Sequence, residues 1–382
     1  MTAGTDTDAD PGAREPSVDI DLASSELRLS GELSIELPAL RKFAGYELLG
    51  RLAVGGMAEV FVARERSEGD ASRLLALKVV RAHLESDASF GEMFLREGQV
   101  ALGLRHPNIC HVYRFGVEEG HYFIAMELVA GITVQDLLVP SGGQARRKLP
   151  APIAVKIASA VAEALHSAHT AKDARGRALR VVHQDVSPHN LMVAYDGTVK
   201  LLDFGVAHSA MEGAPSAAAP VAEPSHTTIR GKFAYIAPEQ CRGVDVDPRT
   251  DVFSLGICLF EMLTGRRLFK RGSTIQTLNA IVAEPLPELA SLGVELPDAL
   301  ARVLDKALQK APRDRYQTAA EMQEDLERFL ADERLAVTST KIAELLRELL
   351  GDEAERAASL DTRPEVVAWL RSGPTPAPAT PV

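Results

Sequence analysis

The hydrophobic pattern changes character about one third of the way along the 382-residue chain. From Tyr46 to Glu127, short apolar runs have the period of strands, and one helix-like segment interrupts them around Phe90–Leu104. The turn residues Glu118–Gly120 separate two of these strands. After Gly131 apolar residues recur at helical spacing, over 152–169, 253–263, 300–308 and 322–330. The pattern therefore predicts a small, mainly β lobe followed by a larger, mainly helical lobe.

The N-terminal extension, residues 1–44, differs from the rest of the chain in charge, with nine acids against four bases. Its first part cannot bury much apolar surface, so we expect the extension to be largely disordered. Near its end, aliphatic residues at 27, 29, 33, 35 and 37 alternate with polar residues or Gly. This alternation indicates either an extra strand or hairpin, docked on the domain or on a partner, or an unstructured tail.

The C-terminal extension, residues 331–382, carries a second amphipathic signal before its Pro-rich end. Apolar residues at 342, 345, 346, 349 and 350 form one stripe of a short helix. The stripe could pack on its own domain or, through residues 339–350, form a homodimer or bind a docking partner. Between the extensions we expect one domain over 45–330, with lobes at 45–128 and 129–330. Within it, the Ala/Pro/Ser-rich stretch 209–225 predicts a mobile loop.

Composition excludes several functional classes. The net charge of −11 provides no overall basic field, so nucleic acid is not an expected partner. No apolar run approaches the roughly 20 residues of a spanning helix, so membrane insertion is not expected. The three cysteines lack metal-ligand spacing and fit small buried or half-buried residues of a reducing cytoplasm. We therefore expect a cytoplasmic protein.

The strongest chemical signal is the run H-Q-D-V-S-P-H-N at 183–190. Asp185 is placed to accept the proton of a substrate hydroxyl, and Asn190, five residues later, is placed to bind a metal ion. Asp203 ends an apolar strand thirteen residues after Asn190, and Gly205 permits a sharp turn there. Two metal ligands and a base at this spacing indicate phosphoryl transfer, which needs positioning and charge neutralisation rather than covalent catalysis.

A phosphate-binding element precedes this run. Gly55 and Gly56 lie between two strands, where a glycine-rich turn lets backbone N–H groups approach phosphates, although Ala53 and Ala58 replace the outer glycines of the usual motif. Lys78 lies inside an apolar strand, where an unpaired charge is costly. Because Glu97 follows nineteen residues later in a helical segment, we predict a phosphate-gripping Lys78–Glu97 pair.

Downstream, Ala237-Pro238-Glu239, Asp251 and Arg315 complete an ordered set of motifs over residues 46–330, which resembles the eukaryotic-type (Hanks-type) bacterial Ser/Thr protein kinases. The resemblance implies an α+β, bilobal protein-kinase fold, with a mainly antiparallel β N-lobe carrying one regulatory helix and a mainly helical C-lobe. It also implies ATP and Mg²⁺ as cofactors, with Mn²⁺ as an alternative metal. Glu239 and Arg315 would form a structural ion pair.

The resemblance further assigns the cofactor contacts. Lys78 would grip the α- and β-phosphates, and Asn190 and Asp203 would hold Mg²⁺. Met126 would be the gatekeeper, and Glu127 and Val129 would offer backbone hydrogen bonds. Adenine would lie between apolar side chains, those of Leu52, Val60, Ala76 and Met192.

Two positions near Asp185 depart from the family pattern. Gln184 replaces an arginine that usually clamps a phosphorylated activation loop, so we expect a kinase of the non-RD type whose activity does not require phosphorylation of Thr227 or Thr228. Ser187 stands where a lysine usually neutralises the γ-phosphate, and Lys232 stands where a threonine usually binds that lysine and the catalytic Asp. We hypothesise that the two roles are exchanged; otherwise Lys232 is a solvated loop residue.

The sequence therefore favours an enzyme that transfers the γ-phosphate of ATP, with Mg²⁺, to Ser or Thr hydroxyls of proteins in bacterial signalling. Its catalytic residues would be Asp185, Lys78, Lys232 and Ser187. The alternative is a nucleotide-binding pseudokinase scaffold that acts through its terminal extensions. The altered glycine loop, Gln184 and Ser187 motivate this alternative, whereas the intact base and metal ligands oppose it.

Overall fold

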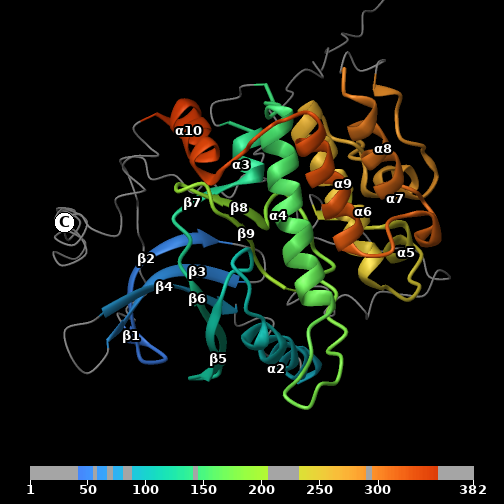
Figure 1. Cartoon of the computed structure of the whole chain (residues 1–382). Helices are drawn as coiled ribbons and strands as arrows, with labels where there is room; N and C mark the ends of the chain where they lie inside the picture. The colour runs from blue at the N-terminus through green and yellow to red at the C-terminus, as the bar shows by residue number, and fades with distance from the viewer. Residues whose placement is uncertain are drawn as a thin grey trace, which may run out of the picture.

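A computed structural model of the chain describes residues 42–54, 58–66, 72–80, 88–140, 145–204, 232–289 and 295–351. It contains two lobes, a β-rich lobe built from the N-terminal elements and a helical lobe that follows it (Figure 1). The division that the hydrophobic pattern predicts is therefore present. The alternating segment at 27–37 and the Ala/Pro/Ser-rich stretch at 209–225 lie outside the described residues.

The small lobe is an antiparallel sheet with strand order β1-β2-β3-β4-β6-β5. The predicted turn joins the last two strands, with Glu119 and Gly120 both at positive φ, 52° and 86°. This geometry matches the twist of a tight hairpin. The strands are β1 Lys42–Phe43, β2 Tyr46–Val54, β3 Ala58–Arg66, β4 Ser72–Val80, β5 Val112–Glu118 and β6 His121–Glu127.

One helix, α2 Ala88–Gly103, packs on this sheet close to β5 and β6 (Figure 1). Phe94 is fully buried in the contact, within 5.2 Å of the Tyr122 ring. A Cβ at Gly98 would come within 2.6 Å of the Phe115 ring, so glycine is needed for the helix to approach the sheet this closely. The helix predicted around 90–104 is thus confirmed.

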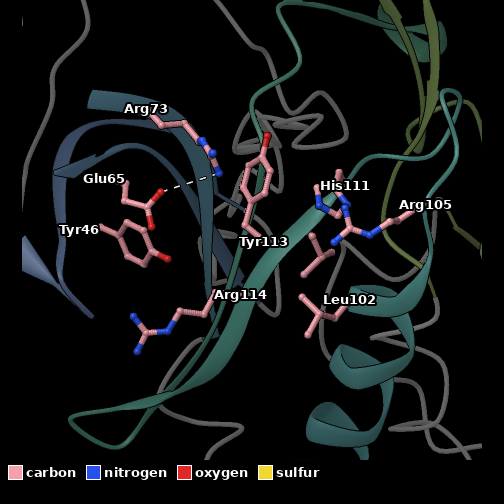
Figure 2. Close-up of a pocket in the computed structure, with 9 residues that line it drawn as sticks. Tyr46, Glu65, Arg73, Leu102, Arg105, His111, Tyr113 and Arg114 are labelled. Carbon is pink, nitrogen blue, oxygen red and sulfur yellow. Dashed lines mark ion pairs between the residues drawn. The ribbon is translucent and has the colours of Figure 1, made fainter. Parts of the chain in front are cut away.

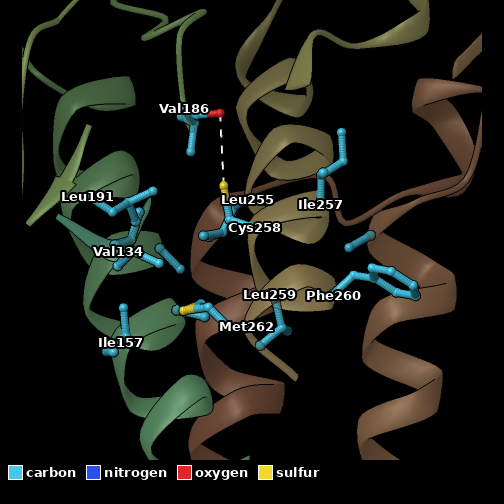
Figure 3. Packing of buried hydrophobic residues seen from close by; sticks show 14 of the residues in the cluster. Val134, Ile157, Val186, Leu191, Leu255, Ile257, Cys258, Leu259, Phe260 and Met262 are labelled. Atoms are coloured by element: carbon cyan, nitrogen blue, oxygen red, sulfur yellow. Dashed lines mark hydrogen bonds between the residues drawn. The ribbon is translucent and has the colours of Figure 1, made fainter. Parts of the chain in front are cut away.

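The large lobe is built around α6 Pro248–Thr264, whose residues are buried from Thr250 to Thr264. Asp247 caps its N-terminus by accepting from the Arg249 N–H, and Gly265 ends it with φ at 68°. Figure 3 shows α6 packed beneath Val186 of the catalytic loop, where the Cys258 thiol lies 4.0 Å from the Val186 carbonyl oxygen. The loop that carries Asp185 therefore rests directly on the hydrophobic core.

The other helices of this lobe surround α6, and all of the predicted helical segments are present. They are α3 Val134–Leu138, α4 Ala151–His169, α5 Pro238–Cys241, α7 Thr274–Ala283, α8 Asp298–Ala307 and α9 Ala319–Asp332. A three-stranded sheet, β7 Gly131–Thr133, β8 Leu191–Ala194 and β9 Val199–Leu201, lies beside the small lobe (Figure 1). None of the helices within the described ranges combines the length and apolar character that crossing a membrane requires.

The C-terminal helix α10, Ser339–Leu350, packs on the large lobe. Ile342 and Leu346 of the predicted stripe are buried in the same core as α4 and α6, and Leu345, Leu349 and Leu350 pack partly against it. Gly197, in the β8–β9 turn, leaves no room for a side chain against the Ser339 backbone. Of the two alternatives for the stripe, the structure shows packing on its own domain.

Candidate active site

One buried carboxylate, that of Asp251, holds the catalytic loop in place. It lies in the first turn of α6 and is fully buried. Its two oxygens accept from the backbone N–H groups of His183 and Gln184, each at 2.7 Å, and the His169 ring nitrogen Nε2 lies 2.8 Å from Oδ2. Hydrogen bonds to a buried charge are the strong ones, so the start of the H-Q-D-V-S-P-H-N run is fixed to the core of the lobe.

The predicted base and metal ligand lie together within this loop. The Asn190 side-chain amide donates to Asp185 Oδ2 at 2.9 Å and to the Asp185 carbonyl at 2.8 Å. Asp185 is only 9% exposed and Asn190 6%. The Asn190 carbonyl in turn accepts from the Leu202 N–H at 2.8 Å, next to Asp203. The spacing read from the sequence thus closes a compact loop in which Asp185 has a fixed orientation.

Lys78 of the small lobe meets Asp203 of the large lobe. The Lys78 Nζ lies 2.9 Å from Asp203 Oδ2, and their side chains are 18% and 32% exposed. Asp203 follows β9 with φ at 50°, a left-handed conformation that is unfavourable for a residue with a side chain. The pair brings the predicted phosphate-binding cation of one lobe into contact with the predicted metal ligand of the other.

The predicted pair of Lys78 with Glu97 is not described. Glu97 lies on α2, as the sequence predicted, but its side chain is outside the described residues, as are Gly55 and Gly56 of the glycine turn. The described partner of Lys78 is Asp203. The Lys78–Glu97 pair therefore stays a prediction.

Several of the expected adenine contacts share one face of the small sheet. Val60 is directly opposite Lys78, and Ala76 is two residues before Lys78 and opposite Met126. Residues directly opposite or two apart in a sheet point to the same face, so Val60, Ala76 and Met126 lie on the face of Lys78. Leu52 is half-buried on β2, and Met192 is buried on β8 of the large lobe.

The segment that follows Met126 connects the lobes and is tied to β9. The Glu127 carboxylate accepts from Lys200 Nζ at 2.8 Å and from the His111 N–H at 3.1 Å. The Glu127 N–H donates to the His111 carbonyl, and its own carbonyl is 3.6 Å from the Cys110 thiol. The Val129 N–H has no hydrogen-bond acceptor among the described residues. The predicted role of Val129 toward the nucleotide stays a prediction.

The structure describes only some of the residues that concern the departures from the family pattern. Ser187 is fully buried, and its hydroxyl has no hydrogen-bond partner within the described part of the chain. Lys232 begins the 3₁₀ turn η2 Lys232–Tyr235, but its side chain is not described. Gln184 has φ at 63°, and its carbonyl accepts from the Gln240 amide at 3.2 Å. Thr227 and Thr228 lie outside the described residues.

The predicted ion pair of Glu239 and Arg315 is present and buried. Two parallel hydrogen bonds join the guanidinium to the carboxylate at 2.7 and 2.8 Å, and Thr250 also donates to Glu239 at 2.8 Å. Burial alone would raise the pKa of Glu239, but the hydrogen bonds and charge of Arg315 outweigh it and lower that pKa. The pair fixes α5 against the base of α6.

Three functional residues were missed by sequence reasoning or given no role at the site. Asp251 was noted as a member of the family's motif set but given no role at the site, and His169 and His183 were not singled out. His183 also bonds the Leu202 carbonyl at 2.9 Å and its ring lies 4.6 Å from that of Phe204. The available signal was an acid in the first turn of an otherwise apolar helix, since such a charge needs buried partners.

Comparison with known proteins agrees with this geometry. The family model described as "Protein kinase domain" matches residues 46–326. The chain is 36% identical over 317 residues to the "Tyrosine-protein kinase MasK" of Myxococcus xanthus, covering 83% of this chain and 48% of MasK. It is 38% identical over 288 residues to the "Serine/threonine-protein kinase PknB" of Mycobacterium tuberculosis, covering 74% of this chain and 42% of PknB. The chain thus spans less than half the length of these curated relatives.

A solved structure gives the same picture of the fold. A cysteine-to-alanine mutant of the PknI kinase domain from Mycobacterium tuberculosis superimposes with a TM-score of 0.55 at 29% identity, covering 77% of this chain and 99% of that chain. This likeness confirms the bilobal fold predicted from the sequence.

Proposed function

Because the chain belongs to the protein kinase family, as its motifs predicted, we propose that it transfers the γ-phosphate of ATP to Ser and Thr hydroxyls of proteins in bacterial signalling. The observation that carries this proposal is the contact of Lys78 with Asp203 between the lobes, together with an Asp185 held by Asn190. A scaffold that only bound partners would not need a base, a cation and two oxygen ligands in one site.

Asp185 would act on the acceptor hydroxyl. Its carboxylate is oriented by the Asn190 amide and by the anchoring of the loop to Asp251, so it can accept the proton as the acceptor oxygen attacks the phosphorus. Lys78 would leave Asp203 in part to contact the phosphates, where its charge offsets theirs. The family uses ATP with a divalent metal ion.

We propose that Asn190 and Asp203 hold that ion as Mg²⁺. Amide and carboxylate oxygens are the ligands that Mg²⁺ accepts, and the ion usually takes only one or two carboxylates, completing its shell with phosphate oxygens and water. Within the described ranges there is no cluster of three His, Cys, Asp or Glu side chains. A site completed by the nucleotide fits this chain, and the ion would neutralise phosphate charge during transfer.

The acceptor class is Ser or Thr in this proposal, with Tyr as a second candidate because MasK is named a tyrosine kinase. The loop after Asp185 reads V-S-P-H-N and lacks the A-A-R or R-A-A pattern of tyrosine kinases. Incubation with labelled ATP, Mg²⁺ and a mixed protein substrate, followed by phosphoamino-acid analysis, separates the two. Label on tyrosine alone would overturn the Ser/Thr assignment.

The same assay tests activity itself. Lys78→Met and Asp185→Asn should each abolish transfer. ATP binding without transfer by the unmodified chain, across several metal ions and substrates, would support the pseudokinase scaffold instead.

We also propose that Lys232 supplies the charge that Ser187 cannot. The buried Ser187 hydroxyl without a described partner supports an interaction with a group outside the described residues, and η2 begins at Lys232 itself. Lys232→Thr should lower kcat by about 100-fold, the scale for losing one stabilising group in the transition state. The double variant Ser187→Lys, Lys232→Thr should recover most of the loss. An unchanged kcat for Lys232→Thr would remove this proposal.

Gln184 supports regulation without a phosphate on the activation loop, because an amide cannot bind phosphate bidentately as a guanidinium does. Alanine at both Thr227 and Thr228 should leave transfer to an added substrate intact. Loss of that activity would contradict the proposal.

A further inference from the structure

A groove on the small lobe, away from Lys78 and Asp185, is lined by arginines. It has a volume of about 590 Å³ and lies between the sheet and the C-terminal end of α2 (Figure 2). We call it the arginine groove and define it by Tyr46, Arg73, Leu102, Arg105, Tyr113 and Arg114. Among the described residues, Glu65 is the one acid that lines it. The groove therefore carries an excess of positive charge on a protein whose net charge is −11.

The three arginines differ in how strongly the domain itself engages them, and Arg114 is the most engaged, with a side-chain hydrogen bond to Tyr46 and a stack over the Phe123 ring at 5.4 Å. Arg73 approaches Glu65 no closer than 3.9 Å and stacks over the Tyr113 ring at 4.7 Å. Arg114 donates to the Ala44 carbonyl at 3.2 Å, and Arg105 is exposed with no partner among the residues described. Guanidinium groups bind carboxylates bidentately, so this lining suits an acidic ligand. The exposed Leu102 adds an apolar contact.

We propose that the arginine groove binds residues 26–37 of this chain's own N-terminal extension. That segment reads E-L-R-L-S-G-E-L-S-I-E-L, so it offers three glutamates against one arginine, separated by aliphatic residues. Its charge and its apolar content both complement the groove. An extended chain covers at most about 3.5 Å per residue, so the five residues from Leu37 to Lys42 give the segment about 17 Å of reach.

The path of the chain supports this occupant. The first described strand, β1 Lys42–Phe43, pairs with β2, and Phe43 lies directly opposite Tyr46, which lines the groove. The Arg114 contact with Ala44 places a groove arginine against the same turn. The extension thus joins the domain beside the groove, which raises its effective concentration there over any separate molecule.

Binding of the extension in the arginine groove would affect the nucleotide side of the small lobe through His111. This residue lines the groove, and its ring lies 5.0 Å from that of Tyr113. Its backbone exchanges two hydrogen bonds with Glu127, which leads into the segment that joins the lobes. The extension would therefore stabilise the position of that segment.

Hydrogen exchange measured by mass spectrometry on the intact chain tests the proposal without using kinase activity. Amides of residues 26–37 should exchange more slowly than an unstructured peptide of the same sequence. In Arg105→Glu, the protection of residues 26–37 should be about tenfold weaker, which is the scale of one charge-assisted hydrogen bond. The matched control Arg175→Glu, an exposed arginine on another surface, should keep it. Unchanged exchange in α2 and β5 verifies that Arg105→Glu is folded.

A charge exchange then identifies the occupant. Glu32→Arg or Glu36→Arg, added to Arg105→Glu, should restore protection. Unprotected exchange of 26–37 in the unmodified chain, or equal protection in Arg105→Glu, would overturn the proposal. Protection that rises with protein concentration would also overturn it, because the groove would then be occupied by a second copy.

Discussion

The two halves of the candidate site are held in very different ways. On the large-lobe side, Asp185, Asn190 and His183 are buried and hydrogen-bonded, and the Asp251 carboxylate in the first turn of α6 binds the backbone where their loop begins. On the small-lobe side, Lys78 has one described partner, and that partner belongs to the other lobe. Folding of the helical core therefore completes one half of the site, whereas the other half depends on how the lobes meet.

The sharpest test of this difference is Asp251→Asn. One amide oxygen cannot replace a charged carboxylate that accepts from two backbone N–H groups and contacts His169. We expect a loss of about 3–5 kcal/mol in the free energy of unfolding, the scale for breaking a buried charged network. Urea denaturation followed by circular dichroism measures it, and transfer activity should fall as well. A loss below about 1 kcal/mol would mean that the loop is fixed by packing alone.

A smaller effect with a pH signature is expected for Glu239→Gln. Arg315 holds the pKa of Glu239 below its ordinary value. The pair therefore stabilises the fold at pH values above the pKa that Glu239 has in the unfolded chain, about 4.3. That stability is lost as pH falls through the lowered pKa. At pH 7 the free energy of unfolding of the variant should be lower by about 2–3 kcal/mol. On acidification, this free energy should fall by less than it does in the unmodified chain.

Unfolding curves for both proteins at pH 7 and at successively lower pH values, from about 4.3 downward, check the sign. The same acid sensitivity in Glu239→Gln and the unmodified chain would show that other carboxylates govern acid unfolding.

The smallest effect on stability is expected at Lys78. Its ion pair with Asp203 is part-exposed, and such pairs contribute about 0–1 kcal/mol. The free energy of unfolding of Lys78→Met should therefore lie within about 1 kcal/mol of that of the unmodified chain, whereas phosphate transfer should be lost. A loss comparable to that of Asp251→Asn would contradict the difference between the two halves of the site.

The sequence predicts contacts between residues that are close in the chain well, and contacts between distant residues poorly. The Asp185–Asn190 geometry follows from a five-residue spacing, and the Glu239–Arg315 pair follows from the family resemblance. The Lys78–Asp203 contact, 125 positions apart, was not predicted, although both residues were assigned to the site. Asp251 was missed as an anchor because its backbone partners lie 67 and 68 positions away, and no local pattern specifies a contact over that separation.

The same distinction applies to the segment between the lobes. Glu127 was assigned a backbone role, whereas its carboxylate is engaged by Lys200, which no local pattern marks. The burial of α10 could be anticipated from its stripe, but its position against Gly197 could not, since no periodicity specifies which surface a helix covers.

Gln184 and Asp203, on either side of the catalytic loop, both adopt positive φ, at 63° and 50°. Each such residue costs about 1–2 kcal/mol relative to an ordinary conformation, and glycine would relieve much of that cost. A laboratory selection for thermal tolerance alone would therefore favour glycine at these two positions. Variants chosen in this way would survive heating with a loosened catalytic loop, so selection on this protein has to score turnover together with melting temperature.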